Sequence, residues 1–394
     1  MRQALEGLKV VEVGNILAGP FCGTMMADFG ADVVKVEPPK KGDLMRNMGR
    51  IKDFWYCVEG RNKKNITLDL KTEEGKKILT RLIKEADILI ENFRPGVFDK
   101  MGFSWEKLQE LNPRLVFVVS SGYGQTGPYA QRPGLDRIGL AVGGFLQITG
   151  FPDRPPIKPG ISTADFFCAL FACCGAMFAI YDRDVRGTGK GQIVDCSLSE
   201  SMLRIQESIV AEYSYDGSIR ERIGNSSEVT VPSGHFLTKD NKYLVLTCSG
   251  DKLYAECMKS IGREDLITNP KYIGQTNRAA HREELNDIVA DWVKEHTIKE
   301  CLDHFGADVP VTKVYDAKDI IEDEQFKARN MILEMPTEKF GNIKMQGVVP
   351  VMSGTPGHVN WAGKPLGSFN EEILCGRLGY TKEQLAKLKE QGVI

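Results

Sequence analysis

Histidine is absent from the first 234 residues of this 394-residue chain. A Ser-His or Cys-His catalytic pair would therefore have to take its base from the second half, which disfavours hydrolases of that kind. The ten cysteines are scattered, lie mostly in apolar runs and include no C-x-x-C pair. Reduced core thiols are expected, and neither a disulfide framework nor a structural zinc site is. The five histidines are His235, His281, His296, His304 and His358.

The chain also lacks an excess of either charge and a long apolar span. Its formal net charge is -2, which gives a nucleic-acid-binding role no electrostatic support. The longest uncharged run of interest, 166–181, falls short of the roughly 20 residues that cross a bilayer, so a buried core helix is expected there. The first residues contain no apolar signal core. We therefore expect a protein of the cytoplasm that does not bind membranes.

The first part of the chain alternates strand and helix patterns. Strands are predicted at 8–13, 32–37, 87–91, 115–120 and 192–196, and helices at 18–29, 72–86, 105–111 and 199–213, whereas 40–65 is loop-like. Such alternation is typical of an α/β domain with an open parallel sheet.

A second region follows a polar, irregular stretch at 220–232. A strand pair at 234–238 and 243–247 is predicted to turn at Asp240-Asn241. Helices are predicted at 252–261, 282–295 and 298–305. Residues 340–394 return to strands and end in a helix at 382–390.

Two glycine-rich stretches resemble phosphate-binding motifs but fail in context. Gly122-Tyr123-Gly124-Gln125-Thr126-Gly127 has the G-x-G-x-x-G spacing, yet prolines follow it and no acidic residue stands about twenty positions later. Residues 187–191 precede a strand and lack the phosphate-loop spacing. Both are interpreted as turns, and no nicotinamide or flavin is expected.

Asp165 is the candidate nucleophile. It stands directly before the uncharged run, where an ionisable group is costly unless it is paired, capping or reactive. The positive end of a helix and free backbone N–H groups can keep a carboxylate ionised there, and a desolvated carboxylate is a usable nucleophile. The structural alternative is that Asp165 only caps the helix, in competition with Ser162 and Thr163.

The loop 91–102 is the candidate ligand-binding segment. It follows the carboxyl end of a predicted parallel strand, the usual place for ligands in open α/β sheets. Phe93, Arg94 and Lys100 combine an aromatic ring with two cations, which suits a phosphorylated nucleotide with an apolar arm. A loop with solvated cations is the alternative.

Taken together, these segments resemble the class III CoA-transferase family, the CaiB–BaiF group that includes formyl-CoA and carnitine CoA-transferases. The resemblance runs nearly end to end. It is carried by Ala18-Gly19-Pro20, Asn65-Ile66-Thr67-Leu68-Asp69-Leu70-Lys71, Glu91-Asn92-Phe93-Arg94-Pro95-Gly96, Ser121-Gly122-Tyr123-Gly124-Gln125-Thr126-Gly127-Pro128, Ala164-Asp165, residues 187–191 and Pro365-Leu366-Gly367. Each segment is weak by itself, but their order and spacing are specific.

The resemblance implies a large Rossmann-like α/β domain with a parallel sheet, built from 1–220 and 336–394, and a smaller α+β domain at 221–335. It implies an interlocked homodimer. The implied activity is transfer of coenzyme A from an acyl-CoA to a carboxylic acid, with neither a metal nor a tightly bound cofactor. The nucleophile falls on Asp165, through an aspartyl anhydride and an aspartyl-CoA thioester. The CoA-binding positions that it implies are Leu17, Ala18, Leu68, Asn92, Phe93, Arg94, Lys100 and Leu135.

This sequence departs from the family pattern after the second strand. Relatives often have an arginine after its final glutamate, whereas Pro38 and Pro39 follow Glu37 here. The phosphate contact is expected to shift, with Lys40 and Lys41 as candidates. The glycine-rich loop of formyl-CoA transferases is missing between Arg220 and Gly234, which argues against formyl or oxalate specificity.

The main alternative on the same fold is an α-methylacyl-CoA racemase. That reaction needs two acid/base groups on opposite faces of the substrate. Racemases carry a histidine where this chain has Leu135 and a glutamate near Leu237, and both are missing here, so transfer is favoured. A non-catalytic CoA-binding protein is the other alternative. Leu17, Met48, Leu135 and Phe145 suggest an apolar acyl pocket, while the donor and acceptor acids stay open.

Overall fold

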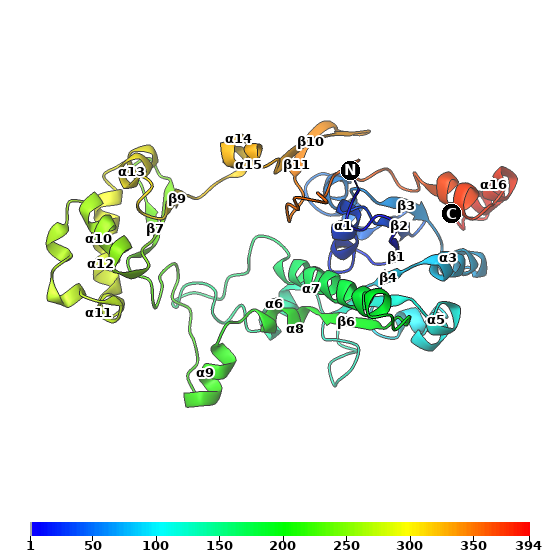
Figure 1. Cartoon of the computed structure of the whole chain (residues 1–394), viewed down its shortest axis with the longest axis horizontal. Coiled ribbons are helices and arrows are strands. Elements are labelled where there is room, and N and C mark those ends of the chain that lie inside the picture. Colours follow the sequence, from blue (N-terminus) through cyan, green and yellow to red (C-terminus); the bar gives the residue numbers. More distant parts are fainter. Residues whose placement is uncertain (1) are drawn as a thin grey trace. The chain divides into compact units, whose positions relative to one another are not determined.

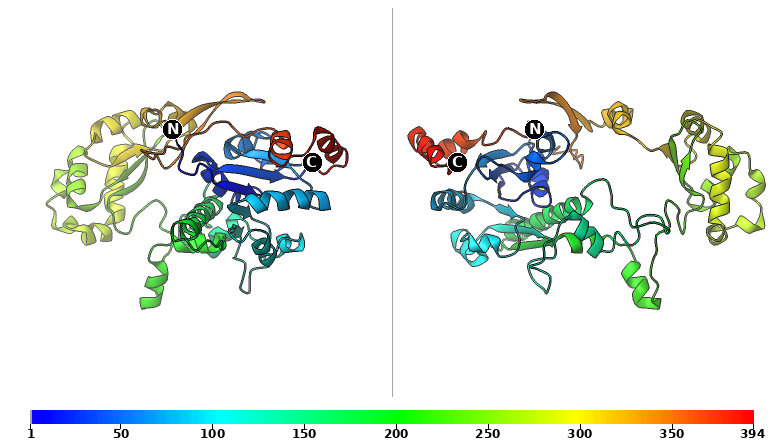
Figure 2. Two further views of the ribbon diagram at one scale, coloured as in Figure 1. Left: turned by 45° about the vertical axis from the view of Figure 1, so that its right-hand side comes forward. Right: turned by 180° about the vertical axis from the view of Figure 1, so that it is seen from behind.

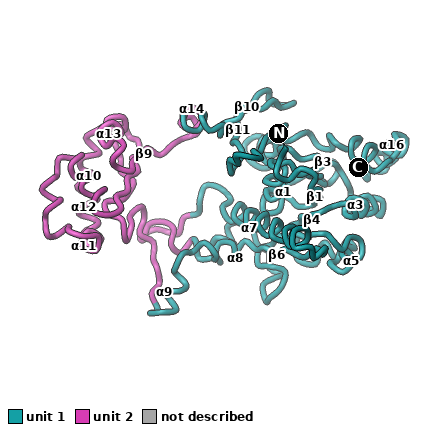
Figure 3. Tube along the Cα trace, viewed as in Figure 1, with its two compact units in different colours: residues 1–145, 158–217, 324–394 teal, residues 146–157, 218–323 magenta. Residues whose placement is uncertain are grey.

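The structure, a computed structural model, describes residues 2–394, which form two compact units. Unit 1 comprises residues 1–145, 158–217 and 324–394, and unit 2 comprises 146–157 and 218–323 (Figure 3). The sequence-based boundaries were 220/221 and 335/336. The compact units therefore divide three residues earlier at the first boundary and twelve residues earlier at the second, and the proline-rich segment 146–157 joins unit 2.

Unit 1 contains a six-stranded, fully parallel sheet with the strand order β3-β2-β1-β4-β5-β6. Mixed α/β architecture with a parallel sheet was the predicted fold class. The chain moves outward from β1 in one direction and then restarts beside β1 with β4, so the sheet has a topological switch point between β1 and β4. The strands are β1 (Lys9–Glu12), β2 (Asp32–Glu37), β3 (Lys64–Thr67), β4 (Ile88–Glu91), β5 (Val116–Ser121) and β6 (Ile193–Ser197).

Helices cover both faces of this sheet because successive strand residues point to opposite sides (Figures 1 and 2). Val10, Val33 and Ile88 lie in register and pack with α1 (Pro20–Asp28) and α7 (Thr163–Ile180). Val11, Val34 and Leu89 face the other way.

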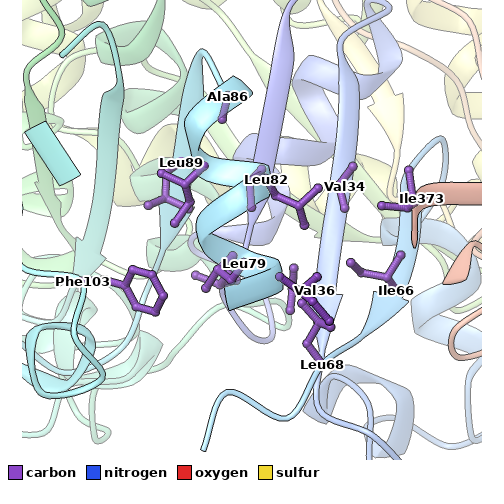
Figure 4. Close-up of a cluster of buried hydrophobic side chains, with 14 of the residues drawn as sticks. Val34, Val36, Ile66, Leu68, Leu79, Leu82, Ala86, Leu89, Phe103 and Ile373 are labelled. Atoms are coloured by element: carbon purple, nitrogen blue, oxygen red, sulfur yellow. The ribbon is translucent and has the colours of Figure 1, made fainter. Parts of the chain in front are cut away.

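The second face is covered by α3 (Glu73–Glu85) and α5 (Trp105–Leu111), together with the C-terminal η5 (Glu372–Arg377) and α16 (Lys382–Glu390). Leu79 and Leu82 of α3 lie over the β2 and β3 side chains, and Ile373 closes the same cluster (Figure 4). The C-terminal segment thus completes a core that the first 120 residues begin.

Helix α7 is the apolar helix that Asp165 precedes in the sequence. Its small residues Ala169, Ala172, Ala176 and Ala179 are buried against the sheet. Thr163–Val185 is long and apolar enough to cross a membrane by length and composition alone, and a third of that window is buried. The prediction of a core helix therefore describes only one face, because Phe178 is 72% exposed on another.

Two local predictions were wrong, and a third held only in part. Residues 40–65 are not all loop: they contain η1 (Leu44–Asn47), α2 (Phe54–Glu59) and the start of β3, whose polar residues concealed an edge strand. The predicted helix 199–213 is two helices, α8 (Leu198–Arg204) and α9 (Ile209–Asp216), because Glu207 adopts a positive φ of 48° between them. The predicted return to strands after residue 340 is limited to β11 of the β10–β11 hairpin (Ile332–Thr337 and Gly341–Gln346), after which no strand follows in the described chain.

Unit 2 is α+β. The hairpin of β7 (Ser233–Leu237) and β8 (Tyr243–Thr247) is confirmed, with Asn241 at a φ of 56° in its turn, and β9 (Val311–Lys313) adds a third antiparallel strand. Helices α10 (Gly250–Ser260), α12 (Arg282–Val293) and α13 (Ile298–Phe305) enclose its own core.

The remaining helical elements of the described chain, from both units, are α4 (Val97–Lys100), α6 (Asp136–Val142), η2 (Tyr181–Val185), η3 (Glu264–Leu266), η4 (Pro270–Tyr272), α11 (Gln275–Ala280), α14 (Ala317–Glu322) and α15 (Glu324–Ala328).

Candidate active site

A cavity of about 230 Å³ opens at the carboxyl ends of β1, β4 and β5, within unit 1. This is the place where open α/β sheets bind ligands, because the loops after β1 and β4 diverge at the switch point and leave a crevice. The cavity therefore follows from the strand order. Its lining residues are Asn15, Ile16, Leu17, Ala18, Asn92, Phe93, Arg94, Pro95, Ser120, Ser121, Gly122, Arg132, Gly134, Leu135, Asp165 and Leu198.

Asp165 lines this cavity as the third residue of α7. It does not cap the helix: the N-cap residue Ser162 makes no side-chain cap, and the Asp136 carboxylate accepts from the first N–H groups instead. The Asp136 Oδ1 accepts hydrogen bonds from the N–H groups of Ala164 at 2.8 Å and Asp165 at 3.4 Å. The capping alternative for Asp165 is therefore wrong, and the first N–H groups of α7 are occupied by another carboxylate.

The Asp165 carboxyl group is poorly solvated. Burial raises its pKa from 3.8 to about 7, and the negative charge of Asp136 adds to the increase. Within residues 2–394, its carboxylate oxygens form no ion pair or hydrogen bond. At neutral pH the group is thus divided between its two protonation states, and its ionised form is an unshielded nucleophile.

Another part of the cavity wall is Asn15–Ala18, which lies in the loop between β1 and α1. Asn92 holds it with two hydrogen bonds: its Oδ1 accepts from the Asn15 N–H at 2.7 Å, and its Nδ2 donates to the Asn15 carbonyl at 2.8 Å. Ile16 is held at a φ of 64°, a strained conformation for a β-branched residue. The end of β4 therefore fixes the loop after β1.

Buried charges support the same segment from behind. The Lys35 ammonium donates to the Gly14 carbonyl and, at 2.7 Å, to the Asp43 carboxylate. The Asp43 Oδ1 accepts the Ile16 N–H at 2.9 Å. Lys35 also contacts Glu12 at 2.8 Å, and all three charged side chains are at most 2% exposed. Charge-assisted hydrogen bonds therefore hold this loop in its strained conformation.

Two glycines bring the remaining wall into place. Gly122 follows β5 and Gly134 precedes α6, and the two backbones cross in direct contact. A Cβ on Gly134 would lie 2.5 Å from the Gly122 Cα. Because no side chain fits between them, Leu135 and Asp136 are held next to the end of β5.

Another titratable group lies behind the cavity. Glu91 ends β4 and accepts the Phe93 N–H at 2.6 Å. Burial raises its pKa to about 8, so it is mostly protonated at neutral pH and adds little negative charge beside Arg94.

The structure places most of the predicted CoA-binding residues together. Leu17, Ala18, Asn92, Phe93, Arg94 and Leu135 share the cavity with Asp165. Leu68 is instead 1% exposed in the sheet core, where its N–H donates to the Glu37 carbonyl. Lys100 is exposed at the end of α4, outside the cavity lining, and Met48 and Phe145 are also not part of that lining.

Sequence reasoning missed several lining residues. Arg132 adds a second cation to the cavity, and its guanidinium stacks 3.7 Å from the Tyr129 ring centre. Ser120 and Ser121 end β5, a position that could have marked them in advance. Asp136 was passed over because its role depends on α7, which lies 27 residues further along the chain.

The residues described contain no cluster of three or more His, Cys, Asp or Glu side chains that could hold a metal. His235 lies on β7 in unit 2, and none of the five histidines lines the cavity. Among the described ionisable side chains, those lining this site are one carboxylate, Asp165, and the guanidinium groups of Arg94 and Arg132. Such a site suits carboxylate chemistry on an anionic substrate.

Comparison with known proteins identifies the class. The sequence model of CoA-transferase family III matches residues 5–369. A succinyl-CoA–D-citramalate CoA-transferase of Chloroflexus aurantiacus is 43% identical, covering 99% of this chain and 98% of the relative. A formyl-CoA:oxalate CoA-transferase of Streptomyces avermitilis is 31% identical over the full length of both chains. The crystal structure of a CaiB/BaiF family protein from Brucella suis superposes with a TM-score of 0.86 at 31% identity, covering 95% of this chain and all of the other.

The chain therefore belongs to CoA-transferase family III. It is an enzyme that transfers coenzyme A between an acyl-CoA and a carboxylic acid. The resemblance noted from the sequence segments is confirmed, as is the activity that it implied.

Proposed function

We propose that Asp165 is the nucleophile of this transfer. The observation that carries the proposal is an unpaired, poorly solvated carboxylate in the cavity at the switch point. Asp136, not Asp165, caps α7, so helix capping does not explain the carboxylate at position 165.

The proposed reaction consists of four nucleophilic attacks. Each attack forms one bond to a carbonyl carbon and breaks another bond to the same carbon. The Asp165 carboxylate attacks the donor thioester carbonyl, giving a mixed anhydride and CoA thiolate. The thiolate attacks the aspartyl carbonyl, and the donor leaves as a free carboxylate. The acceptor carboxylate attacks the resulting aspartyl-CoA thioester and releases thiolate again. That thiolate attacks the acceptor carbonyl, forming the new acyl-CoA and restoring Asp165.

Backbone N–H groups are the expected oxyanion donors. Those of Ala164 and Asp165 are engaged by Asp136. Ala18 lines the cavity, and its N–H makes no hydrogen bond within the described chain. It lies two residues before the first helical residue of α1, where the helix dipole favours negative charge. One such donor stabilises an oxyanion by ~3 kcal/mol in other enzymes.

The apolar wall around Asp165 supports transfer over proton exchange. Leu17, Leu135 and Leu198 line the cavity with it, and none of them titrates. Leu135 in particular offers no second acid/base group for racemisation. Leu17 and Leu198, which are both buried, also reduce access of water, which would hydrolyse the anhydride.

The CoA-binding residues remain a proposal. We assign the cavity residues Leu17, Ala18, Phe93, Arg94 and Leu135 to direct contact with the acyl-CoA. Asn92 acts through the loop that it holds, since its amide is already bound to Asn15. Leu68 supports the end of β3 from within the sheet core, and Lys100 contacts a phosphate that extends beyond the cavity.

We further propose succinyl-CoA as donor and a hydroxydicarboxylic acid as acceptor. Relatives of Chloroflexus aurantiacus at 43% and 38% identity are named for succinyl-CoA with D-citramalate and with L-malate. A dicarboxylic substrate reacts at Asp165 through one carboxyl group and keeps the other as a free carboxylate. Arg94 and Arg132, both exposed at the cavity, supply cations for that second carboxylate.

We propose an interlocked homodimer in the cytoplasm. Support comes from apolar side chains on α7 and η2 that are unusually exposed for a soluble chain: Phe178, Tyr181 and Val185 are 58–72% exposed. A relative at 36% identity is named as the alpha subunit of a succinyl-CoA–L-malate CoA-transferase, so pairing with a second, different chain is the competing arrangement. The molar mass of the purified chain in solution distinguishes the two arrangements. A homodimer has twice the mass of the chain, whereas a chain that pairs only with a different chain has the mass of a monomer.

The nucleophile is tested by incubation with succinyl-CoA and hydroxylamine, followed by mass spectrometry. We expect a hydroxamate on Asp165 in the wild type and none in Asp165→Ala. We also expect Asp165→Ala to lose transfer at least 10³-fold while it keeps its circular dichroism spectrum. Modification of a different carboxylate, or wild-type rates in Asp165→Ala, would move the nucleophile. Deuterium uptake at the substrate α-carbon without an acceptor would instead indicate racemase chemistry.

A further inference from the structure

Two cysteine side chains face each other beside the active-site cavity. Helix α7 packs against β6, an edge strand of the sheet (Figure 1). Cys168 belongs to α7 and Cys196 to β6. Each thiol donates to the backbone carbonyl of the other residue, at 3.5 Å from the Cys168 sulfur and 3.3 Å from the Cys196 sulfur. This reciprocal arrangement places the two side chains alongside one another.

Residues of the cavity lining flank this cysteine pair. Asp165 precedes Cys168 by three residues, so the two lie on the same side of α7, about one turn apart. Leu198 follows Cys196 by two residues, where β6 passes into α8. Ser120 is the partner of Cys196 in the register of β5 with β6. A change in the spacing of the two cysteines is therefore transmitted to three residues of the cavity wall.

The two thiols differ in reactivity. Cys196 is half-buried on the edge strand, whereas Cys168 is fully buried. A hydrogen bond from the Cys168 thiol lowers the pKa of Cys196, and the Ser201 hydroxyl, 3.6 Å from the Cys196 sulfur, acts in the same direction, while burial opposes both. The same contact between thiols, followed by burial, raises the pKa of Cys168. Cys196 is thus the more readily ionised thiol, and the thiolate is the form that peroxides oxidise.

We propose that Cys168 and Cys196 are a reversible oxidation site, at which hydrogen peroxide forms a disulfide that inactivates the enzyme. The Cys196 thiolate attacks one peroxide oxygen, the O–O bond breaks, and the sulfenic acid of Cys196 and hydroxide form. The hydroxide takes up the proton that Cys196 released. The Cys168 thiol then attacks the sulfenic sulfur, and the hydroxyl group leaves with the Cys168 proton as water. Two thiols and one peroxide give one disulfide and two waters, and a dithiol reductant restores both thiols.

The disulfide changes the geometry around the nucleophile. Bonded sulfur atoms lie about 2 Å apart, whereas non-bonded heavy atoms stay roughly 3.5 Å apart. Bond formation therefore draws the start of α7 and the end of β6 together by on the order of 1 Å, and a displacement of this size can lower catalysis about 10²-fold. The effect on the rate rests on the proposed function of Asp165, but formation of the disulfide does not.

A second thiol pair on the same helix provides the matched control. Cys173 of α7 is partly buried, and a hydrogen bond with the Cys22 thiol lowers its pKa, while burial opposes this. Cys173 lies about two turns beyond Asp165, and neither it nor an adjacent residue of α7 lines the cavity. Cys173 therefore has the chemistry of Cys196 without its contact with the cavity wall.

The test exposes the full chain to hydrogen peroxide, blocks the remaining thiols by alkylation, and measures cross-linked peptides by mass spectrometry and CoA transfer by initial rates. We expect a Cys168–Cys196 cross-link, at least a tenfold fall in kcat, and recovery of the rate after dithiothreitol. Cys196→Ala should form no cross-link and should keep its rate in peroxide. Cys168→Ala, a second variant, should also form no cross-link. Cys173→Ala should be inactivated like the wild type.

Three results would overturn the proposal. The inactivated wild type could lack the Cys168–Cys196 cross-link, the cross-linked enzyme could keep its rate, or Cys173→Ala could protect the rate where Cys196→Ala does not. A loss that dithiothreitol fails to reverse would indicate sulfinic acids and would count against a disulfide. Failure of the proposed nucleophile is a separate observation, because Asp165→Ala would then transfer CoA before any oxidation.

Discussion

The protonation of Asp165 should set the pH dependence of the enzyme between pH 6 and 8. Only the ionised carboxylate can attack a thioester. With a pKa of about 7, the ionised fraction rises from about one-eleventh at pH 6 to about ten-elevenths at pH 8. Because kcat/KM reports the free enzyme, it should rise about tenfold over this interval. An aspartate at its ordinary value of 3.8 would give no change there.

Asp136→Asn tests the cause of the shift. Asparagine keeps an oxygen that can accept the Ala164 N–H, but it removes the negative charge that helps to raise the Asp165 pKa. The acid limb of kcat/KM should therefore move to lower pH. Glu390→Gln, which removes a carboxylate on α16 outside the active-site cavity, is the matched control and should leave the limb in place.

The assay follows initial rates of CoA exchange from pH 5.5 to 8.5 at constant ionic strength. Substrate carboxylates with an ordinary pKa of about 4 stay ionised throughout. A flat profile, or a limb that moves to higher pH in Asp136→Asn, would refute the reasoning that burial and Asp136 control this group.

The same shift has a consequence for stability. Since the folded-state pKa lies above the unfolded value, folding favours protonated Asp165, and stability is lost as pH rises from about 4 through about 7. Asp165→Asn has no carboxyl group to ionise, so it avoids this loss of stability. Chemical denaturation should show it equal to the wild type near pH 4 and more stable at pH 8, by about 4 kcal/mol at most and less where water reaches the carboxylate. Equal stability at both pH values would contradict the shift.

Three further substitutions test how the site is positioned. Gly134→Ala places a Cβ 2.5 Å from the Gly122 Cα, so kcat/KM should fall more than tenfold, whereas Gly376→Ala, which meets no atom within 4 Å, should be neutral. Asn92→Ala releases Asn15 and should raise the KM for acyl-CoA with less effect on kcat; an unchanged KM would count against its role. Lys35→Met leaves the Glu12 and Asp43 carboxylates buried without their shared cation, and urea denaturation should show a loss of about 3–5 kcal/mol; a stable variant would mean that Lys63 compensates.

The local patterns of this sequence determined the elements around the site. Valine- and isoleucine-rich runs form the central parallel strands because both faces of such strands are buried, and the segments at Ala18, Asn92 and Asp165 could be assigned from their order along the chain. Asp165 itself stood out because a charge at the head of an apolar helix is costly.

Sequence alone did not decide which of these residues meet. The strand order places β4 beside β1, and only this makes Asn92 a neighbour of Asn15, 77 residues earlier. Asp136 caps α7, so the role left for Asp165 depended on a contact 29 residues away. The edge strand β3 was equally hidden, because its polar residues acquire their role only beside β2 and the segment around residue 365. Local propensity acts over one turn or one strand, whereas desolvation and charge pairing act between surfaces that folding brings together.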